Sequence, residues 1–254
     1  MSNTYFASDF HLGIEASKSS KERELLICNW LDEIAPLANR IYLLGDMFDF
    51  WFEYRHAVPK GFVRLLGKLG EMTDSGIQIQ VFTGNHDLWM WNYFKDELGI
   101  QVHHHSIIEV INGKKFFLAH GDGLGPDDYS YKRMKKLFTH PFSKALYRFL
   151  HPDIGIPLAN YFSGRSRNTQ QTVKKYLGHD KEWLIQYVER KSKEIDIDYF
   201  VFGHRHLPID YTLSNQNSRY INLGDWLVHQ SYAIFDGEEM KLCFYKNDET
   251  TIYH

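Results

Sequence analysis

Five short polar motifs, most of them directly preceded by an apolar run, constrain the fold of this chain more than any other feature. The motifs are Asp9-Phe10-His11, Gly45-Asp46, Gly84-Asn85-His86-Asp87, His120-Gly121-Asp122 and Gly203-His204-Arg205-His206. Runs such as Ile41-Tyr42-Leu43-Leu44 and Tyr199-Phe200-Val201-Phe202 have the length and composition of buried strands. Because open α/β sheets bind ligands at the carboxyl ends of their strands, we expect the motifs to meet at one edge of the molecule.

The chemistry of these motifs predicts a site for two metal ions. Their ligand atoms are carboxylate oxygen, amide oxygen and imidazole nitrogen without thiolate, a set that suits Mn²⁺, Fe²⁺, Mg²⁺ or Zn²⁺. A carboxylate such as Asp46 can bridge two cations. Two such ions about 3.5–4 Å apart lower the pKa of a shared water and clamp both oxygens of an in-line phosphoryl displacement. The neutral His and Asn ligands leave the site with positive charge for a phosphate.

The overall composition is that of a soluble globular protein, with 43% apolar and 24% charged residues in 254. We expect a single domain over residues 1–254, because this length can bury one full core. The sequence has no apolar stretch long enough for a membrane span and no signal-like start. Cys28 and Cys243 do not form a disulfide pattern, which favours a reducing, cytoplasmic location.

Positive charge is concentrated between residues 129 and 195, a segment that contains 14 Lys or Arg and only five Asp or Glu. This segment therefore carries about nine positive charges, and the rest of the chain about twelve negative ones, since the total is −3. Such a segment indicates either an anionic partner (phosphate, nucleic acid or a membrane surface) or only a solvated helical face.

The periodicity predicts an α/β body, a helical insertion over 129–195 and a strand-rich C-terminal part. Helices are expected at about 19–38, 61–73 and 89–98, and a hairpin is expected across Asn112-Gly113. Within the insertion we expect helices at 129–150 and from residue 157 to about 193. The run His103-His104-His105 suggests a further metal site, although histidines outside the five motifs are more often structural or solvated.

The complete, ordered motif set resembles the calcineurin-like metallophosphoesterase superfamily. The resemblance implies a four-layer α-β-β-α sandwich, with the helical insertion forming a cap. It assigns one metal to Asp9, His11, Asp46 and His206, and the other to Asp46, Asn85, His120 and His204. It also implies that His86, oriented by Asp87, faces the phosphate as a catalytic proton donor or transition-state stabiliser.

Two longer segments, 45–51 and 120–128, together with the insertion, are similar to the UDP-2,3-diacylglucosamine diphosphatase family of lipid A biosynthesis. That similarity implies hydrolysis of the pyrophosphate bond to 2,3-diacylglucosamine 1-phosphate (lipid X) and UMP by a metal-activated hydroxide, with Mn²⁺ the usual metal. The alternative is a metallophosphoesterase for another nucleotide, pyrophosphate or nucleic-acid phosphodiester. We expect peripheral association with the cytosolic face of the inner membrane, no nucleic-acid partner and no obligate protein partner.

The same resemblance places substrate contacts at Asn85 and His86 and in the insertion. The further contacts are Asp128, which directly precedes the insertion, and Arg165, Ser166, Arg167, Asn168 and Lys174 within it. Apolar insertion residues would bind acyl chains, or else pack the insertion against the body; they are Phe138, Phe142, Leu146, Phe149, Leu150, Ile154, Ile156, Leu158, Tyr161 and Phe162. Two positions depart from the best-known family members, since His86 replaces an Arg and Arg205 replaces a common Thr.

Overall fold

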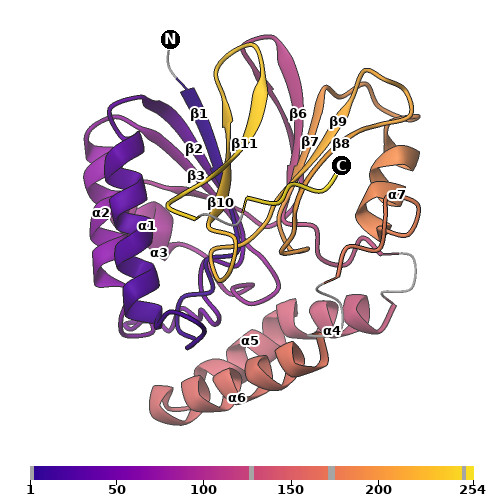
Figure 1. Ribbon diagram of the computed structural model, residues 1–254. Helices are drawn as coiled ribbons and strands as arrows, with labels where there is room; N and C mark the ends of the chain where they lie inside the picture. The colour runs from indigo at the N-terminus through magenta and orange to yellow at the C-terminus, as the bar shows by residue number, and fades with distance from the viewer. Residues whose placement is uncertain (1–2, 126–128, 171–174, 248–249) are drawn as a thin grey trace.

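Two β-sheets face each other in this protein (Figure 1). The computed structural model describes residues 3–125, 129–170, 175–247 and 250–254, and only the backbone of 130, 160, 162 and 164–170. The first sheet has the order β11-β10-β1-β2-β3-β4 and the second the order β5-β6-β7-β9-β8. The bounds of the first six strands are β1 Asn3–Ala7, β2 Ala38–Leu44, β3 Gln78–Phe82, β4 Gln101–His103, β5 Ile107–Ile111 and β6 Lys114–Ala119. Those of the last five are β7 Tyr199–Phe202, β8 Pro208–Thr212, β9 Arg219–Leu223, β10 Ser231–Phe235 and β11 Met240–Phe244.

Helices cover the outer face of each sheet, so the body has four layers. Helices α1 (Ser20–Ile34), α2 (Val63–Asp74) and α3 (Tyr93–Leu98) lie on the first sheet, and α7 (Trp183–Lys191) lies on the second (Figure 1). Aromatic and aliphatic side chains such as Phe6, Phe116 and Val201 fill the space between the sheets. Strand β7 is buried on both faces, which explains its uninterrupted Tyr-Phe-Val-Phe sequence. The predicted α-β-β-α sandwich is confirmed.

The central strands of each sheet are parallel, and this brings the motif loops to one edge. Strands β1 to β4 pair in parallel, as do β6, β7 and β9. The carboxyl ends of β1, β2, β3, β6 and β7 are followed by the loops that carry the five motifs. Antiparallel strands adjoin the first group on one side and the second group on both sides. The β5–β6 hairpin turns at Asn112 (φ 47°) and Gly113 (φ 80°) as the Asn-Gly pair predicts.

The helical insertion divides into two parts. Helices α4 (Tyr129–Thr139), α5 (Pro141–Arg148) and α6 (Pro152–Gln170) form a layer below the edge of the sheets, here called the cap (Figure 1). Helix α7 was expected inside the insertion, but it packs on the second sheet through Leu184, Ile185 and Val188. The separate layer therefore covers 129–170 and not the whole of 129–195.

Some element limits differ from the expected ones for local reasons. Helix α1 begins after Ser19, whose side chain accepts from the Glu22 backbone in a capping box, and it ends at Ile34 because β2 already starts at Ala38. The short strand β4 was not expected, because three residues are too few to show an alternation of apolar and polar side chains. Within the part of the chain that the structure describes, no helix is both long and apolar enough to cross a membrane.

Candidate metal centre

The ligand-bearing loops hold their key residues in an unusual backbone conformation. Asp9, His11, Asp46, His204 and His206 all have positive φ, between 45° and 67°. Each such residue costs roughly 1–3 kcal/mol and persists only where surrounding contacts hold it. These contacts are present, because the Asp9 amide donates to Gly45 O and the His11 amide to Asp46 O, each at 3.0 Å. The fold therefore tolerates local backbone strain at these residues, and this conformation points their side chains into the centre.

Glycines next to the ligands allow the loops to approach closely. A Cβ on Gly203 would lie 2.5 Å from the Asp9 carboxylate and 2.6 Å from the Ser8 hydroxyl. A Cβ on Gly84 would collide with the side chain and the backbone of Asp46. Because real Cβ atoms do not come so near, both positions require glycine, and the two loops can then pack against the carboxylates.

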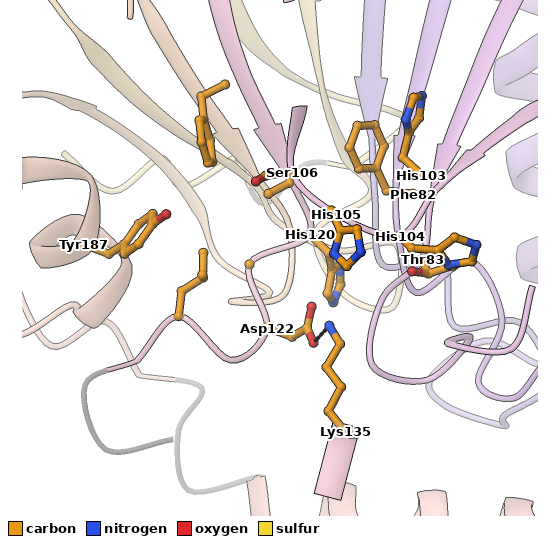
Figure 2. A pocket seen from close by; sticks show the side chains of 14 residues that line it. Phe82, Thr83, His103, His104, His105, Ser106, His120, Asp122, Lys135 and Tyr187 are labelled. Carbon is orange, nitrogen blue, oxygen red and sulfur yellow. Dashed lines mark hydrogen bonds and ion pairs between the residues drawn. The ribbon is translucent and has the colours of Figure 1, made fainter. Parts of the chain in front are cut away.

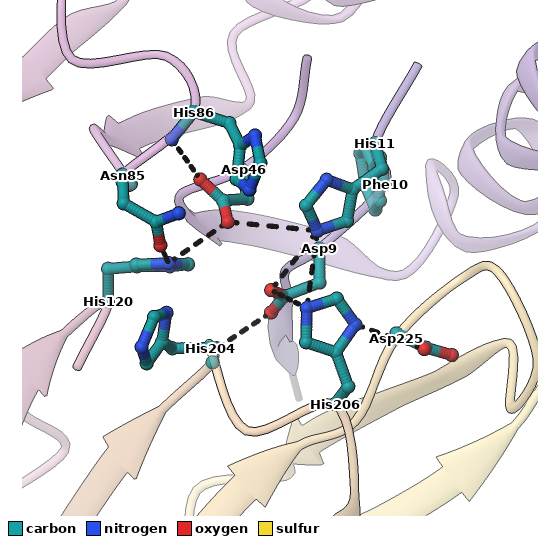
Figure 3. Close-up of polar contacts among 12 residues, drawn as sticks. Asp9, Phe10, His11, Asp46, Asn85, His86, His120, His204, His206 and Asp225 are labelled. Carbon is teal, nitrogen blue, oxygen red and sulfur yellow. Dashed lines mark hydrogen bonds and ion pairs between the residues drawn. The ribbon is translucent and has the colours of Figure 1, made fainter. Parts of the chain in front are cut away.

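One cluster of ligand atoms is formed by Asp9, His11 and His206, with Asp46 beside it (Figure 3). The Nε2 atoms of His11 and His206 are 3.3 Å apart. Asp9 Oδ1 lies 3.4 Å from His206 Nε2 and 3.7 Å from His11 Nε2, and Asp46 Oδ2 lies 3.7 Å from His11 Nε2. The structure thus brings together all four residues predicted for the first metal.

The second cluster is built around the same Asp46 carboxylate. His120 Nε2 lies 3.3 Å from Asp46 Oδ2 and 3.3 Å from Asn85 Oδ1, and His204 completes the group (Figure 3). Asp46 is therefore the member shared by both clusters, as the bridging role requires. Burial opposes its ionisation, but His120 and neighbouring imidazoles hold the pKa of Asp46 well below its usual value.

Two of the cluster histidines, His120 and His206, are oriented by partners on their other ring nitrogen. His120 Nδ1 lies 2.7 Å from Leu44 O, and His206 Nδ1 lies 3.1 Å from Asp225 Oδ2. Although burial works against it, the contact with His206 lowers the pKa of Asp225 to about 2. Such contacts fix the ring and its tautomer so that Nε2 faces the site. Asp225 was not found from the sequence, because a lone Asp after a strand has no distinguishing pattern.

These residues fit a pair of divalent cations on structural grounds. Asp9 Oδ1 is buried and has no hydrogen-bond partner among the described residues, so a bound cation would satisfy an oxygen that is otherwise costly to bury. The converging atoms are oxygen and imidazole nitrogen, and three groups of them are close enough to hold an ion. The third group contains His11, Asp46 and His86, so the assignment of His86 to substrate and not to metal stays a prediction.

The His86 ring is contacted by two residues that sequence reasoning missed. Its Nδ1 atom lies 2.8 Å from the Ser163 hydroxyl of α6 and 3.5 Å from the Asp49 carboxylate. Ser163 also donates to Asp49, to Oδ2 at 3.0 Å. Burial lowers the pKa of His86 to about 4, so the metal-free ring is neutral at pH 7. A residue of the cap therefore reaches directly into the centre.

The Asp87 carboxylate contacts backbone amides, whereas the resemblance implied that it orients the His86 ring. Its carboxylate accepts hydrogen bonds from the backbone amides of Gly84 at 2.7 Å and Met47 at 2.8 Å. It therefore ties the loop of Asn85 and His86 to the loop of Asp46, and the His86 ring is contacted by Asp49 and Ser163 instead. Burial and the nearby charge of Asp46 raise the pKa of Asp87 to about 7.

For the phosphoester hydrolysis expected from the sequence, replacing Ser163 by Ala should lower kcat about tenfold and change KM little. The reason is that the hydroxyl contacts the His86 ring and not the bulk of the substrate. Ser163→Thr keeps the hydroxyl and should recover most of kcat. Steady-state kinetics on the three proteins provides the measurement. Equal kcat values for wild type and the Ala variant would show that Ser163 is not needed to position the ring.

The other predicted substrate contacts are Asp128 and five residues of the insertion. Asp128 and Lys174 lie outside the described residues. Arg165, Ser166, Arg167 and Asn168 lie in the last part of α6, of which only the backbone is described. Their assignment stays a prediction. Asn85 and His86 lie in the centre itself.

The two facing sheets, with paired ligand clusters at the carboxyl ends of their strands, define a metallophosphoesterase. A UDP-2,3-diacylglucosamine hydrolase of Porphyromonas gingivalis is 40% identical over 258 residues, covering 95% of this chain and 97% of that protein. One of Haemophilus influenzae (strain Rd) is 27% identical over 235 residues, covering 92% and 93%. The chain therefore belongs to the UDP-2,3-diacylglucosamine hydrolase family.

Comparison with solved structures gives weaker matches. Yfce, a phosphoesterase from E. coli, superposes with a TM-score of 0.48 at 14% identity, covering 96% of this chain and 93% of that one. Vps29 of Entamoeba histolytica with Zn²⁺ gives a TM-score of 0.45 at 11% identity, covering 94% and 89%. No family model matches the chain.

Proposed function

We propose that this chain hydrolyses the pyrophosphate bond of UDP-2,3-diacylglucosamine, releasing UMP and 2,3-diacylglucosamine 1-phosphate, with Mn²⁺ as its metal. The observation that carries the proposal is the position of the cap: helices α4, α5 and α6 lie below a centre with two clusters of metal-ligand candidates, and Ser163 of α6 contacts His86 of that centre. The family supports the substrate, because the relatives are named for hydrolysis of this molecule.

The residues divide the chemistry between them. Two divalent cations held by the clusters would supply positive charge for the pyrophosphate and would acidify the attacking water. Asp46 faces both clusters through Oδ2, which lies 3.7 Å from His11 Nε2 and 3.3 Å from His120 Nε2, while Oδ1 accepts from the His86 backbone amide. His86, fixed by Ser163 and Asp49, is positioned to place an N–H against a phosphate oxygen as charge develops. The deep burial of Asp9 and His11 keeps bulk water away from this edge of the centre.

The cap offers apolar surface that its own packing does not use. Phe149 is 89% exposed, Phe142 71% and Leu146 61%, and Ile154 and Leu158 are also exposed. Burying acyl methylenes on such side chains yields about 0.8 kcal/mol each. The basic residues of the same helices favour anionic headgroups. We infer that the cap takes the acyl chains and rests on the cytosolic face of the inner membrane.

The direct test is release of UMP from UDP-2,3-diacylglucosamine by the purified protein with Mn²⁺. We expect UMP from the diacylated substrate and much slower release from UDP-glucosamine without acyl chains. In oxygen-labelled water the label should appear in UMP, because attack falls on the uridylyl phosphorus. Folded, metal-loaded protein that releases no UMP would refute the function, and label in the lipid product would refute the point of attack.

Removing exposed aromatic side chains from the cap should weaken lipid engagement. For Phe142→Ser with Phe149→Ser we expect turnover of substrate in anionic vesicles to fall at least about tenfold, because full burial of each ring would contribute roughly 2 kcal/mol and about 1.4 kcal/mol already corresponds to tenfold. Val63, which is 74% exposed at the start of α2, provides the matched control as Val63→Ser. Equal vesicle binding by the double variant, the control and the wild type would contradict membrane contact through the cap.

A further inference from the structure

A cavity lies beside the metal centre, and the candidate metal ligands and the apolar surface of the cap leave its role unassigned. It has a volume of about 200 Å³ and is bounded by the loop after β4, by the end of β6 and by α4 (Figure 2). His120, a member of the second cluster, forms part of its wall, so the cavity adjoins the centre. Pockets for drug-sized molecules commonly measure ~300–1,000 Å³, so this one suits a smaller fragment.

The histidine run 103–105 contributes to this cavity. Among the described residues, none of the groups able to hold a metal includes His103, His104 or His105, so the further metal site suggested by the sequence is not formed. His103 has a structural role, because it contacts Gln80 Oε1 at 2.7 Å and stacks on Phe82 at 4.8 Å between ring centroids. His104 and His105 line the cavity together with Ser106 and Thr83.

The cavity has an apolar floor and positive or dipolar walls. Phe117, Ala119 and Leu124 form apolar lining, which suits a flat ring. Lys135 of α4 reaches the opening, and Lys144 lies near enough to His104 to act on it electrostatically. The one carboxylate in the described lining, Asp122, is balanced by Lys135 Nζ at 2.5 Å and the Tyr131 hydroxyl at 2.5 Å. The walls therefore favour an anionic, hydrogen-bonding ligand over an acyl chain.

We propose that this cavity is the subsite for the nucleoside monophosphate half of the substrate, with His104, His105 and Ser106 contacting the uracil and ribose. The inference rests on the proposed function, because it assumes a UDP-sugar. A pyrophosphate across the two clusters has two ends, and the cap offers apolar surface suited to the acylated one. The cavity on the His120 side takes the other end, and its imidazoles and hydroxyls match the donors and acceptors of a pyrimidine.

The test compares His104→Ala, His105→Ala and the double variant with His179→Ala, an exposed histidine that stacks on Tyr211 and does not line the cavity. Three quantities are measured: KM for UDP-2,3-diacylglucosamine, inhibition by UMP, and turnover of bis(p-nitrophenyl) phosphate, which has no nucleoside. For the double variant we expect KM and the UMP inhibition constant to rise roughly tenfold, as for the loss of one or two hydrogen bonds. Turnover of the generic diester should stay within about twofold, and the His179 control should match wild type on all three.

Different outcomes of this experiment contradict the proposed subsite and the proposed substrate. An unchanged UMP inhibition constant in the double variant would overturn the subsite even if wild type releases UMP normally. Failure of wild type to release UMP, with generic diester turnover intact, would instead reject the proposed substrate. His104→Gln and His105→Gln keep a polar side chain of similar reach, so their inhibition constants decide the matter should the Ala variants fold poorly.

Discussion

Asp46→Asn is expected to lower phosphodiesterase activity by at least roughly a thousandfold, equivalent to about 4 kcal/mol of transition-state stabilisation. The reason is that Asp46, alone among the described carboxylates, lies within 3.3–3.7 Å of both His120 and His11, so its charge acts on both clusters. The amide keeps the shape of the side chain and leaves an oxygen for the His86 amide, which now donates to Asp46 Oδ1 at 2.9 Å. The loop should therefore survive the substitution.

Asp225→Asn is the graded control for this experiment. Asp225 contacts the far side of His206 and no other member of the clusters, so its loss should cost only about 10–100-fold in activity or metal affinity. Metal content by mass spectrometry and the shift of Tm on adding Mn²⁺ provide measurements besides activity. If both variants lost activity equally, or if Asp46→Asn bound two metals and turned over normally, a shared bridging carboxylate would be excluded.

The local features of this fold were predictable because their causes are local. The strand Tyr199–Phe202 is apolar throughout because both its faces are buried, and a run of that composition shows this directly. The Asn112-Gly113 turn follows from the tolerance of these two residues for positive φ. The convergence of the candidate metal ligands was predictable for a related reason, since five motifs at strand ends are each weak but come together once the strands are parallel.

The missed residues act across long separations in the chain. Ser163 reaches His86 from 77 residues away, and Asp225 reaches His206 from outside the motif that contains it. A single Ser on a helix or Asp after a strand has no spacing that distinguishes it. Helix α7 was misplaced for a similar reason: its apolar face at Leu184, Ile185 and Val188 has ordinary helical spacing. Only the tertiary structure shows that this face packs on the second sheet.

Arg205→Met is expected to destabilise the protein by about 3–5 kcal/mol, because it leaves a buried carboxylate without its partner. Arg205 binds Glu182 through two hydrogen bonds of 2.7 and 2.8 Å, and the two side chains are 4% and 1% exposed. Arg205 also donates to Lys175 O, just beyond the cap. Since it stands between His204 and His206, the same pair holds the loop of two metal-ligand candidates against the start of α7.

A double-mutant cycle separates the net contribution of the Arg205–Glu182 pair to the free energy of unfolding from the cost of leaving one of the two charges unpaired. Arg205→Met combined with Glu182→Leu should recover much of the loss, since two apolar side chains leave no unpaired charge. Arg219→Met is the matched control, because the Arg219–Asp210 pair is also doubly hydrogen-bonded but partly exposed, and it should lose at most about 1 kcal/mol. Urea unfolding gives the free energies. A loss at Arg205 no larger than at Arg219 would mean that burial of this pair does not hold the loop, and the positive φ angles of His204 and His206 would then require another support.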